Sequence, residues 1–201
     1  SPGDVWVNWH PGIDSITIAS EADYEVGIPF VMIDRESGEI VAKLEIPLIP
    51  TNVAFNSEKD VMYFNSFKDT YLVSWDMNTH EVIKLVNTSP STDRLIYDPE
   101  TSEVLVASTM EGAILRYDAD TLEYKGKINV SLGDRTITID QKRNLLLVGN
   151  FINNRVQVID LKTYKRVASF YIGPWIRTIT LDVENGIAYV STVRNLFKVK
   201  Y

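Results

Sequence analysis

Three arginines lie where polar turns lead into predicted β-strands: Arg94, Arg135 and Arg177. Arg135 and Arg177 share a register, each five residues before an aspartate, whereas Arg94 lies four residues before Asp98. A guanidinium group presents a planar fork of donors that can bind a carboxylate or a phosphate through two hydrogen bonds. These arginines therefore predict either a site for an anionic ligand or a set of structural ion pairs with neighbouring aspartates.

Two aspartates, Asp93 and Asp134, directly precede two of these arginines. They are the ion-pair partners in the structural interpretation, whereas in an enzyme one of them could act as a general base. Trp175, in a Gly-Pro-Trp turn, is either an aromatic anchor for a ligand or partner or a residue packed over neighbouring strands. We assign no catalytic residue, and we take as the candidate ligand or partner face Asp93, Arg94, Asp134, Arg135, Trp175 and Arg177.

The remaining polar residues predict no metal site and no cofactor. The chain has no cysteine and only two histidines, His10 and His80, which lack metal-ligand spacing. Glu21, Asp23 and Glu25 alternate along one loop and could coordinate calcium, but a solvated loop is the preferred interpretation because no complete calcium-loop frame is present. No phosphate-binding loop, dinucleotide fingerprint or nucleophile elbow occurs in the sequence.

Composition narrows the class of partner. The 201 residues carry a net charge of −7 with both signs interspersed, which argues against binding to nucleic acid. No run of apolar residues is long enough for a transmembrane helix. The chain begins Ser-Pro-Gly without an initiating methionine, and we expect it to be a piece of a longer protein.

Four aspartates recur every 42 residues: Asp34, Asp76, Asp118 and Asp160. A serine or threonine follows each one three residues later, and a bulky apolar residue precedes it. Such side chains can accept hydrogen bonds from the amides of a tight turn. A catalytic group would not be needed in every repeat, so we interpret these aspartates as turn-forming residues.

Each repeat is predicted to form four short β-strands, which in the fourth repeat are residues 135–140, 144–149, 155–160 and 165–172. Antiparallel four-stranded units with this period are typical of the blades of a β-propeller. We therefore predict an all-β fold with about five blades, four complete and the last without its outer strand. They form a single propeller domain over residues 1–201 or part of a larger propeller, with units at about 5–46, 52–86, 93–130, 135–172 and 177–201. Tyr201 follows Ile159 by 42 residues, so the fifth copy is expected to end just before its aspartate.

The segment Leu145–Gly173, LLLVGNFINNRVQVIDLKTYKRVASFYIG, resembles the YVTN-type β-propeller repeat of bacterial and archaeal proteins. Looser versions occur at Ile187–Thr192 and Val61–Ser66. The resemblance implies an extracytoplasmic location (periplasmic, secreted or at the cell surface) and a closed propeller with more blades than this chain contains. The family includes binding proteins, subunits of oxidoreductases and lactonase-like enzymes, so the resemblance leaves the activity open.

Our favoured hypothesis is a non-enzymatic binding or assembly module that contacts a protein partner, or the rest of a larger propeller, through its channel face and loops. An extended peptide could also add to the open edge of the last blade. The alternative is a lactonase-like hydrolase or an oxidoreductase subunit in which Arg135 and Arg177 bind a small anion and Asp93 or Asp134 is the base. A strongly raised pKa of one aspartate in an open pocket would favour the enzyme, and paired carboxylates would favour the scaffold.

Overall fold

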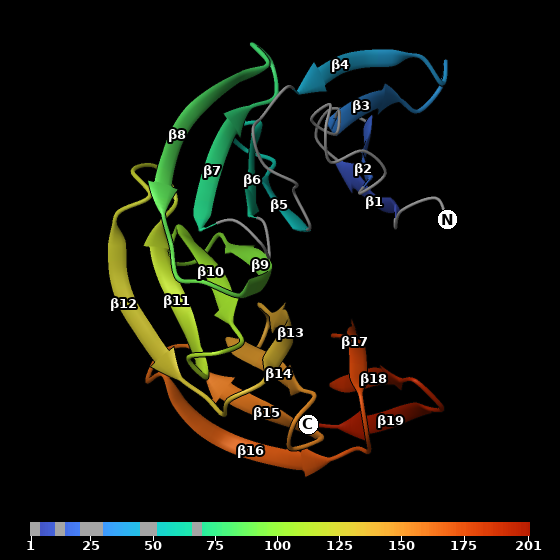
Figure 1. The fold of residues 1–201 in the computed structure, drawn as a ribbon. Helices are drawn as coiled ribbons and strands as arrows, with labels where there is room; N and C mark the ends of the chain where they lie inside the picture. Colours follow the sequence, from blue (N-terminus) through green and yellow to red (C-terminus); the bar gives the residue numbers. More distant parts are fainter. Residues whose placement is uncertain (1–4, 11–14, 21–29, 45–51, 66–69) are drawn as a thin grey trace. The chain divides into compact units, whose positions relative to one another are not determined.

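The computed structural model describes residues 5–10, 15–20, 30–44, 52–65 and 70–201, and side chains over 31–43, 52–65 and 70–201 (Figure 1). Every regular element in these ranges is a β-strand, and all strand pairs are antiparallel, which confirms the predicted all-β class. Among the described residues there is no helix long and apolar enough to cross a membrane. The chain divides into two compact units, residues 1–91 and residues 92–201.

The first unit contains two four-stranded sheets, each with its strands in chain order. One comprises β1 (Val5–His10), β2 (Ser15–Ser20), β3 (Phe30–Asp34) and β4 (Ile40–Leu44). The other comprises β5 (Asn52–Asn56), β6 (Val61–Asn65), β7 (Tyr71–Asp76) and β8 (Glu81–Asn87).

The second unit contains three sheets, of which two have four strands and one has three. The first is formed by β9 (Thr92–Asp98), β10 (Glu103–Ser108), β11 (Ala113–Asp118) and β12 (Tyr124–Asn129). The second is formed by β13 (Asp134–Asp140), β14 (Leu145–Asn150), β15 (Arg155–Asp160) and β16 (Lys165–Tyr171). The third is formed by β17 (Ile176–Asp182), β18 (Ile187–Thr192) and β19 (Leu196–Lys200).

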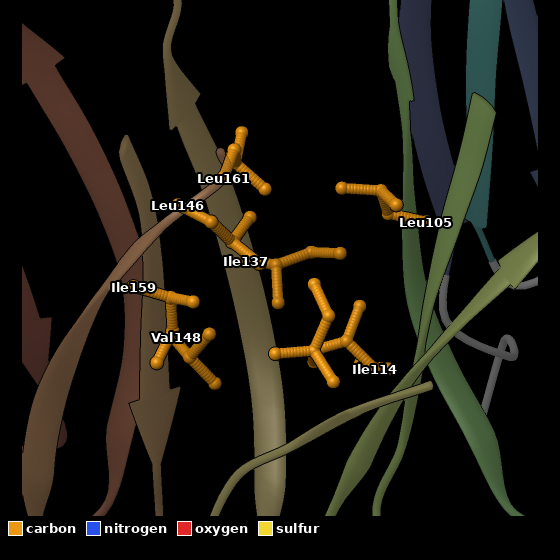
Figure 2. Close-up of a cluster of buried hydrophobic side chains, with 9 residues drawn as sticks. Leu105, Ile114, Ile137, Leu146, Val148, Ile159 and Leu161 are labelled. Carbon is orange, nitrogen blue, oxygen red and sulfur yellow. The ribbon is translucent and has the colours of Figure 1, made fainter. Parts of the chain in front are cut away.

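Apolar side chains fill the space between successive sheets, because a single sheet cannot bury both of its faces. In the first unit a cluster around Trp75 and Phe64 joins β3 and β4 to the β5–β8 sheet. In the second unit one cluster joins β10 and β11 to the β13–β16 sheet (Figure 2). A further cluster, which includes Val156 and Val190, joins that sheet to β17–β19.

The turns after β3, β7, β11 and β15 repeat the same geometry. The amide of the serine or threonine donates to the aspartate Oδ1 three residues earlier, at 2.7–3.0 Å. This hydrogen bond is the main cause that lowers the pKa of all four aspartates, as expected for carboxylates that accept from turn amides. The turn interpretation of these residues therefore agrees with the structure.

The predicted alignment of the last strand is wrong by two residues. Ile187 pairs with Lys200, whereas Leu145, its equivalent in the preceding sheet, pairs with Asp160. The amide of Tyr201 donates to the carbonyl of Gly186 as the amide of Leu161 donates to that of Asn144. The turn between β18 and β19 is two residues shorter than the β14–β15 turn, so Lys200 occupies the position of the repeated aspartate.

Candidate functional site

Asp93, Arg135 and Arg177 occupy the same register at the start of β9, β13 and β17, each one five residues before the last residue of its strand. β13 contacts both β9 and β17, so these strands are neighbours in the second unit. Arg135 Nε lies 3.0 Å from Asp93 Oδ2. The structure thus brings this aspartate and this arginine together as an ion pair between two strands, the arrangement expected for a structural role.

Arg94 and Arg177 are exposed, and no ion pair joins either guanidinium to a carboxylate of the described residues. Arg94 lies one residue beyond the shared register. The guanidinium carbon of Arg177 lies 5.8 Å from the centre of the Trp175 ring, within the range of a cation–π contact. The other neighbour of Trp175 is Phe151, whose ring centre is 6.0 Å away. The structure therefore places an aromatic and a cationic group side by side.

Trp175 is 51% exposed, although its backbone is held in place. Its amide donates to Asn154 Oδ1 at 3.3 Å, and its φ of 60° lies in the left-handed region. That conformation is costly for a residue other than glycine and persists when the surroundings fix it. The indole is thus displayed at the surface by a constrained turn, which corresponds to the anchor interpretation more closely than to packing over the strands.

Asp134 is completely buried at the start of β13, and no hydrogen bond of normal geometry reaches either of its carboxylate oxygens. Its own carbonyl accepts from the Thr109 hydroxyl at 2.8 Å. Burial raises the pKa of the Asp134 carboxyl to about 8, and the charges of Asp93 and Glu111 add to the increase, while the amides of Asp134 and Ser108 act against it. The carboxyl is therefore protonated at neutral pH, but no solvent reaches it.

One further feature was not predicted: a row of exposed apolar side chains in the loops that connect the sheets and the middle strands of the second unit. Successive loops are joined by backbone hydrogen bonds from Gly133 to Thr109 and from Phe151 to Gly133. Each of the five loops displays one apolar side chain that is about half or more exposed. We call these residues the loop rim: Met110, Leu132, Ile152, Trp175 and Val193.

The sequence contained a signal for the loop rim. Each of its members lies in a turn that also contains Gly, Ser, Asn or Arg, although Phe151 stands directly before Ile152 in the same turn. An isolated exposed apolar residue is ordinary, so each one alone predicts nothing. Their common placement became evident only when the strand boundaries put all five in the loops that connect the sheets or the middle strands.

Other predicted features carry less information. Among the described residues no group of three or more His, Cys, Asp or Glu side chains could hold a metal ion. The loop Glu21–Ile28 and the side chain of His10 lie outside the described ranges. An open hollow of about 380 Å³ beside β16 is lined in part by Arg155 and Arg166, but by none of the predicted site residues.

Comparison with known proteins identifies the type of fold but not the function. No family model matches the chain, and no curated protein matches it. A chain of hydrazine synthase from Kuenenia stuttgartiensis is similar in structure, with a TM-score of 0.81 and 16% sequence identity over 94% of this chain and 56% of that one. The computationally designed protein Ika8 is similar with a TM-score of 0.73 and 13% identity, over 97% of this chain and 57% of that one.

This chain thus spans just over half the length of both similar structures. At these identities the likeness extends to the fold alone. Together with the antiparallel sheets of four strands, it shows that the chain has an all-β, propeller-like fold.

Proposed function

We propose that this chain is a non-enzymatic binding module that contacts another protein through the loop rim of its second unit. The observation that carries the proposal is that each of five loops in the second unit exposes one large apolar side chain, and that backbone hydrogen bonds join three of these loops in succession. Grouped exposed apolar residues mark interaction sites more often than scattered ones do, because a partner can remove them from water together.

Trp175 is the residue that we expect to dominate the binding energy. Interfaces depend on a few well-buried residues, among which tryptophan and arginine are enriched. Trp175 and Arg177 supply both types in one contact, and the left-handed backbone of Trp175 limits the conformational entropy that binding would cost. The partner would present apolar residues to the loop rim and a carboxylate to Arg177.

The geometry supports a binding module better than the alternative of an enzyme that holds a small anion. A general base must reach its substrate, and Asp134 is completely buried. Asp93 is paired with Arg135, so the charge of this arginine is already partly neutralised and is less available to bind an anion. The raised pKa of Asp134 favours an active site only where the group lies in an accessible cleft.

We also propose that the sheets are blades of a larger closed propeller of the YVTN type, supported by the 42-residue repeat and by the propeller-like fold. The extracytoplasmic location rests on the resemblance alone. Fractionation of the source cells, followed by detection with an antibody, would test the location. The intact mass of the native protein would test whether further blades belong to it.

The binding proposal is tested with two matched variants, Trp175→Ala in the loop rim and Tyr124→Ala on the outer strand β12. Both residues are aromatic and about half exposed, at 51% and 56%. The protein that co-purifies with the wild type from its source is identified by mass spectrometry and purified. Its dissociation constant for each form is then measured by calorimetry.

We expect Trp175→Ala to weaken binding by roughly 30-fold, as for an interface residue worth about 2 kcal/mol. Tyr124→Ala should change the dissociation constant by less than about twofold. Equal effects of the two substitutions, or a purified partner that binds the Trp175→Ala protein as tightly as the wild type, would refute a contact at the loop rim.

A further inference from the structure

The open hollow of about 380 Å³ beside β16 is the one feature of the second unit that the loop rim does not use. Its lining residues come from β15 and β16: Arg155, Arg166, Val167, Ala168 and Ser169. Pockets that hold small organic molecules have volumes of about 300–1,000 Å³, so this hollow has room for such a ligand.

Strand pairing places the polar residues of this region on one face of the sheet. Gln157 pairs with Ser169, and Ile159, two residues further along β15, pairs with Arg166. Residues two apart on a strand point to the same face, so the side chains opposite them, Ser169 and Arg166, also share that face. Ser169 and Arg166 are three residues apart, and a β-bulge at Val167 accounts for the extra residue.

Arg155 lies two residues before Gln157 and therefore belongs to the same face. Its Nε donates to the Ser169 hydroxyl at 2.8 Å, and its Nη2 donates to the Ser169 carbonyl at 3.2 Å. Both acceptors are neutral, so these hydrogen bonds fix the direction of the guanidinium without compensating its charge. The remaining N–H donors of this preorganised group suit an anion, because little conformational entropy is lost when it binds.

Neither arginine of the hollow forms an ion pair with a carboxylate in the described part of the chain. Residues 155–171 include four basic residues and one acidic residue, Asp160, in a chain whose net charge is −7. The Oδ1 atom of Asp160 already accepts from the amides of Lys162 and Thr163. The field beside the hollow is therefore positive, which attracts anions.

A buried amide on the same face also lacks a partner. Gln157 is 1% exposed, and its Nε2 atom has no hydrogen-bond partner among the described residues. The other four-stranded sheets have aliphatic residues at this position: Val31, Val73 and Leu115. A buried donor without an acceptor destabilises the fold, whereas an aliphatic side chain does not. Gln157 is therefore explained by an acceptor that the described residues do not provide.

The polar side chains of β16 are also particular to this sheet. The position of Arg166 holds Ile40, Val82 and Tyr124 in the other sheets. The position of Ser169 holds Lys43, Leu85 and Lys127. No other four-stranded sheet combines two arginines, an amide and a hydroxyl at these places, so the shared architecture does not require this combination.

We propose that this hollow binds the oxyanion group of a small organic molecule, either a phosphate monoester or a carboxylic acid. Arg155 and Arg166 hold the oxyanion through charge-assisted hydrogen bonds, for which a guanidinium fork is suited. Gln157 donates a further hydrogen bond, and the aliphatic part of the ligand lies against Val167 and Ala168. No residue of the loop rim takes part, so ligand binding here and partner binding there are separate functions.

The probes are butyl phosphate and pentanoate, which carry the same aliphatic chain, and butanol, which lacks the oxyanion. The full chain is isotopically labelled and titrated with each probe, and the NMR signal of the Arg155 Nε–H group reports on the hollow. Arg166→Gln removes one of its guanidinium groups. The matched control Lys165→Gln removes the same charge one residue away, where Lys165 pairs with Asp160 on the opposite face of the sheet.

We expect at least one anionic probe to bind and to shift the Arg155 Nε–H signal, and butanol to leave it unchanged. The anion that binds more tightly identifies the class of oxyanion. Arg166→Gln should weaken binding at least about tenfold, because it removes charge-assisted hydrogen bonds, whereas Lys165→Gln should change the dissociation constant by less than about twofold. Gln157→Leu should also weaken binding but keep at least the wild-type unfolding midpoint, because Leu115 fills the equivalent position of β11.

Binding of neither anion, or equally tight binding of butanol, would overturn the proposal. Equal weakening by Arg166→Gln and Lys165→Gln would overturn it as well, because the anions would then respond to the overall charge and not to this hollow. A probe that binds without shifting the Arg155 Nε–H signal would have the same consequence, since its site would lie elsewhere.

Discussion

Replacement of Asp134 by asparagine should stabilise the protein at neutral pH. The carboxyl is completely buried, and no hydrogen bond of normal geometry reaches either oxygen. Its pKa in the folded protein is about 8, against an ordinary value of 3.8 that applies to the unfolded chain. Between these two pH values the unfolded chain is ionised while the folded protein keeps its proton. The free energy of unfolding therefore falls as pH rises from about 4 to about 8.

The size of the effect follows from the difference between the two pKa values. Each pKa unit corresponds to about 1.4 kcal/mol, so a difference of about four units removes about 5 kcal/mol by pH 8 and about 4 kcal/mol by pH 7. Asparagine has nearly the same shape and does not ionise. Asp134→Asn should thus differ little from the wild type at pH 4, and the difference should grow steadily towards pH 8.

The assay is unfolding in urea at several pH values between 4 and 8.5, with the free energy of unfolding compared between variant and wild type at each pH. Asp182→Asn is the control, because the pKa of Asp182 is shifted in the opposite direction: hydrogen bonds from Asn185 lower it. Such a group stabilises the fold above its ordinary pKa and loses that effect as pH falls through its lowered pKa. The difference in free energy of unfolding between Asp182→Asn and the wild type should therefore stay constant between pH 5 and 8.

A flat difference between Asp134→Asn and the wild type across this pH range would refute the reasoning. It would mean that the carboxyl ionises near its ordinary pKa in the folded protein, with water or a cation beside it. A variant that is less stable than the wild type at pH 7 would refute it as well, because the aspartate would then be making favourable contacts that asparagine cannot make.

Other substitutions test two turns, an ion pair within one sheet and a hydrogen bond between two sheets. Gly186 has a φ of 64°, so Gly186→Ala should lower stability by about 1–2 kcal/mol, whereas Ser102→Gly at the equivalent turn (φ 51°) should raise it by up to about 1 kcal/mol, both measured by urea unfolding. Arg116→Met removes the bidentate partner of the buried Glu103 carboxylate and leaves it paired with Lys125 at 3.0 Å, so the free energy of unfolding should fall by about 1–3 kcal/mol; restoration by a second substitution, Glu103→Leu, would identify the less compensated charge as the cause. Tyr201→Phe removes a hydroxyl that donates at 2.9 Å to the Asp140 carboxylate of the neighbouring sheet, so the free energy of unfolding should fall by about 1 kcal/mol. An unchanged free energy of unfolding would show that this hydrogen bond does not stabilise the fold.

The repeat made most of the fold predictable. A period of 42 residues with the same aspartate turn fixed where the strands lie, and strand pairing set by such turns leaves little choice of register. The prediction failed at β19 because the spacing was extrapolated through a turn that had lost two residues. Counting from the end of a repeat is safe only where every loop keeps its length.

The candidate site was less predictable because it depends on burial. Asp93 and Arg135 were expected to pair with some neighbour, and the structure shows that they pair with each other. A charged residue at the start of a strand predicts exposure, so the complete burial of Asp134 could not be read from its type. The equivalent residues Thr92 and Ile176 carry no charge, which marks Asp134 as unusual among its repeats.

Comparison between repeats also supports the proposed contact at Trp175. Equivalent positions in a repeat protein have the same structural role. A residue that differs from its counterparts without improving the packing is therefore explained by something other than the fold. Trp175 departs by exposing an indole in a strained turn, at a surface position where a partner could remove the apolar group from water. Asp134 departs in the interior, where no partner can reach it, and we therefore assign it to stability rather than to binding.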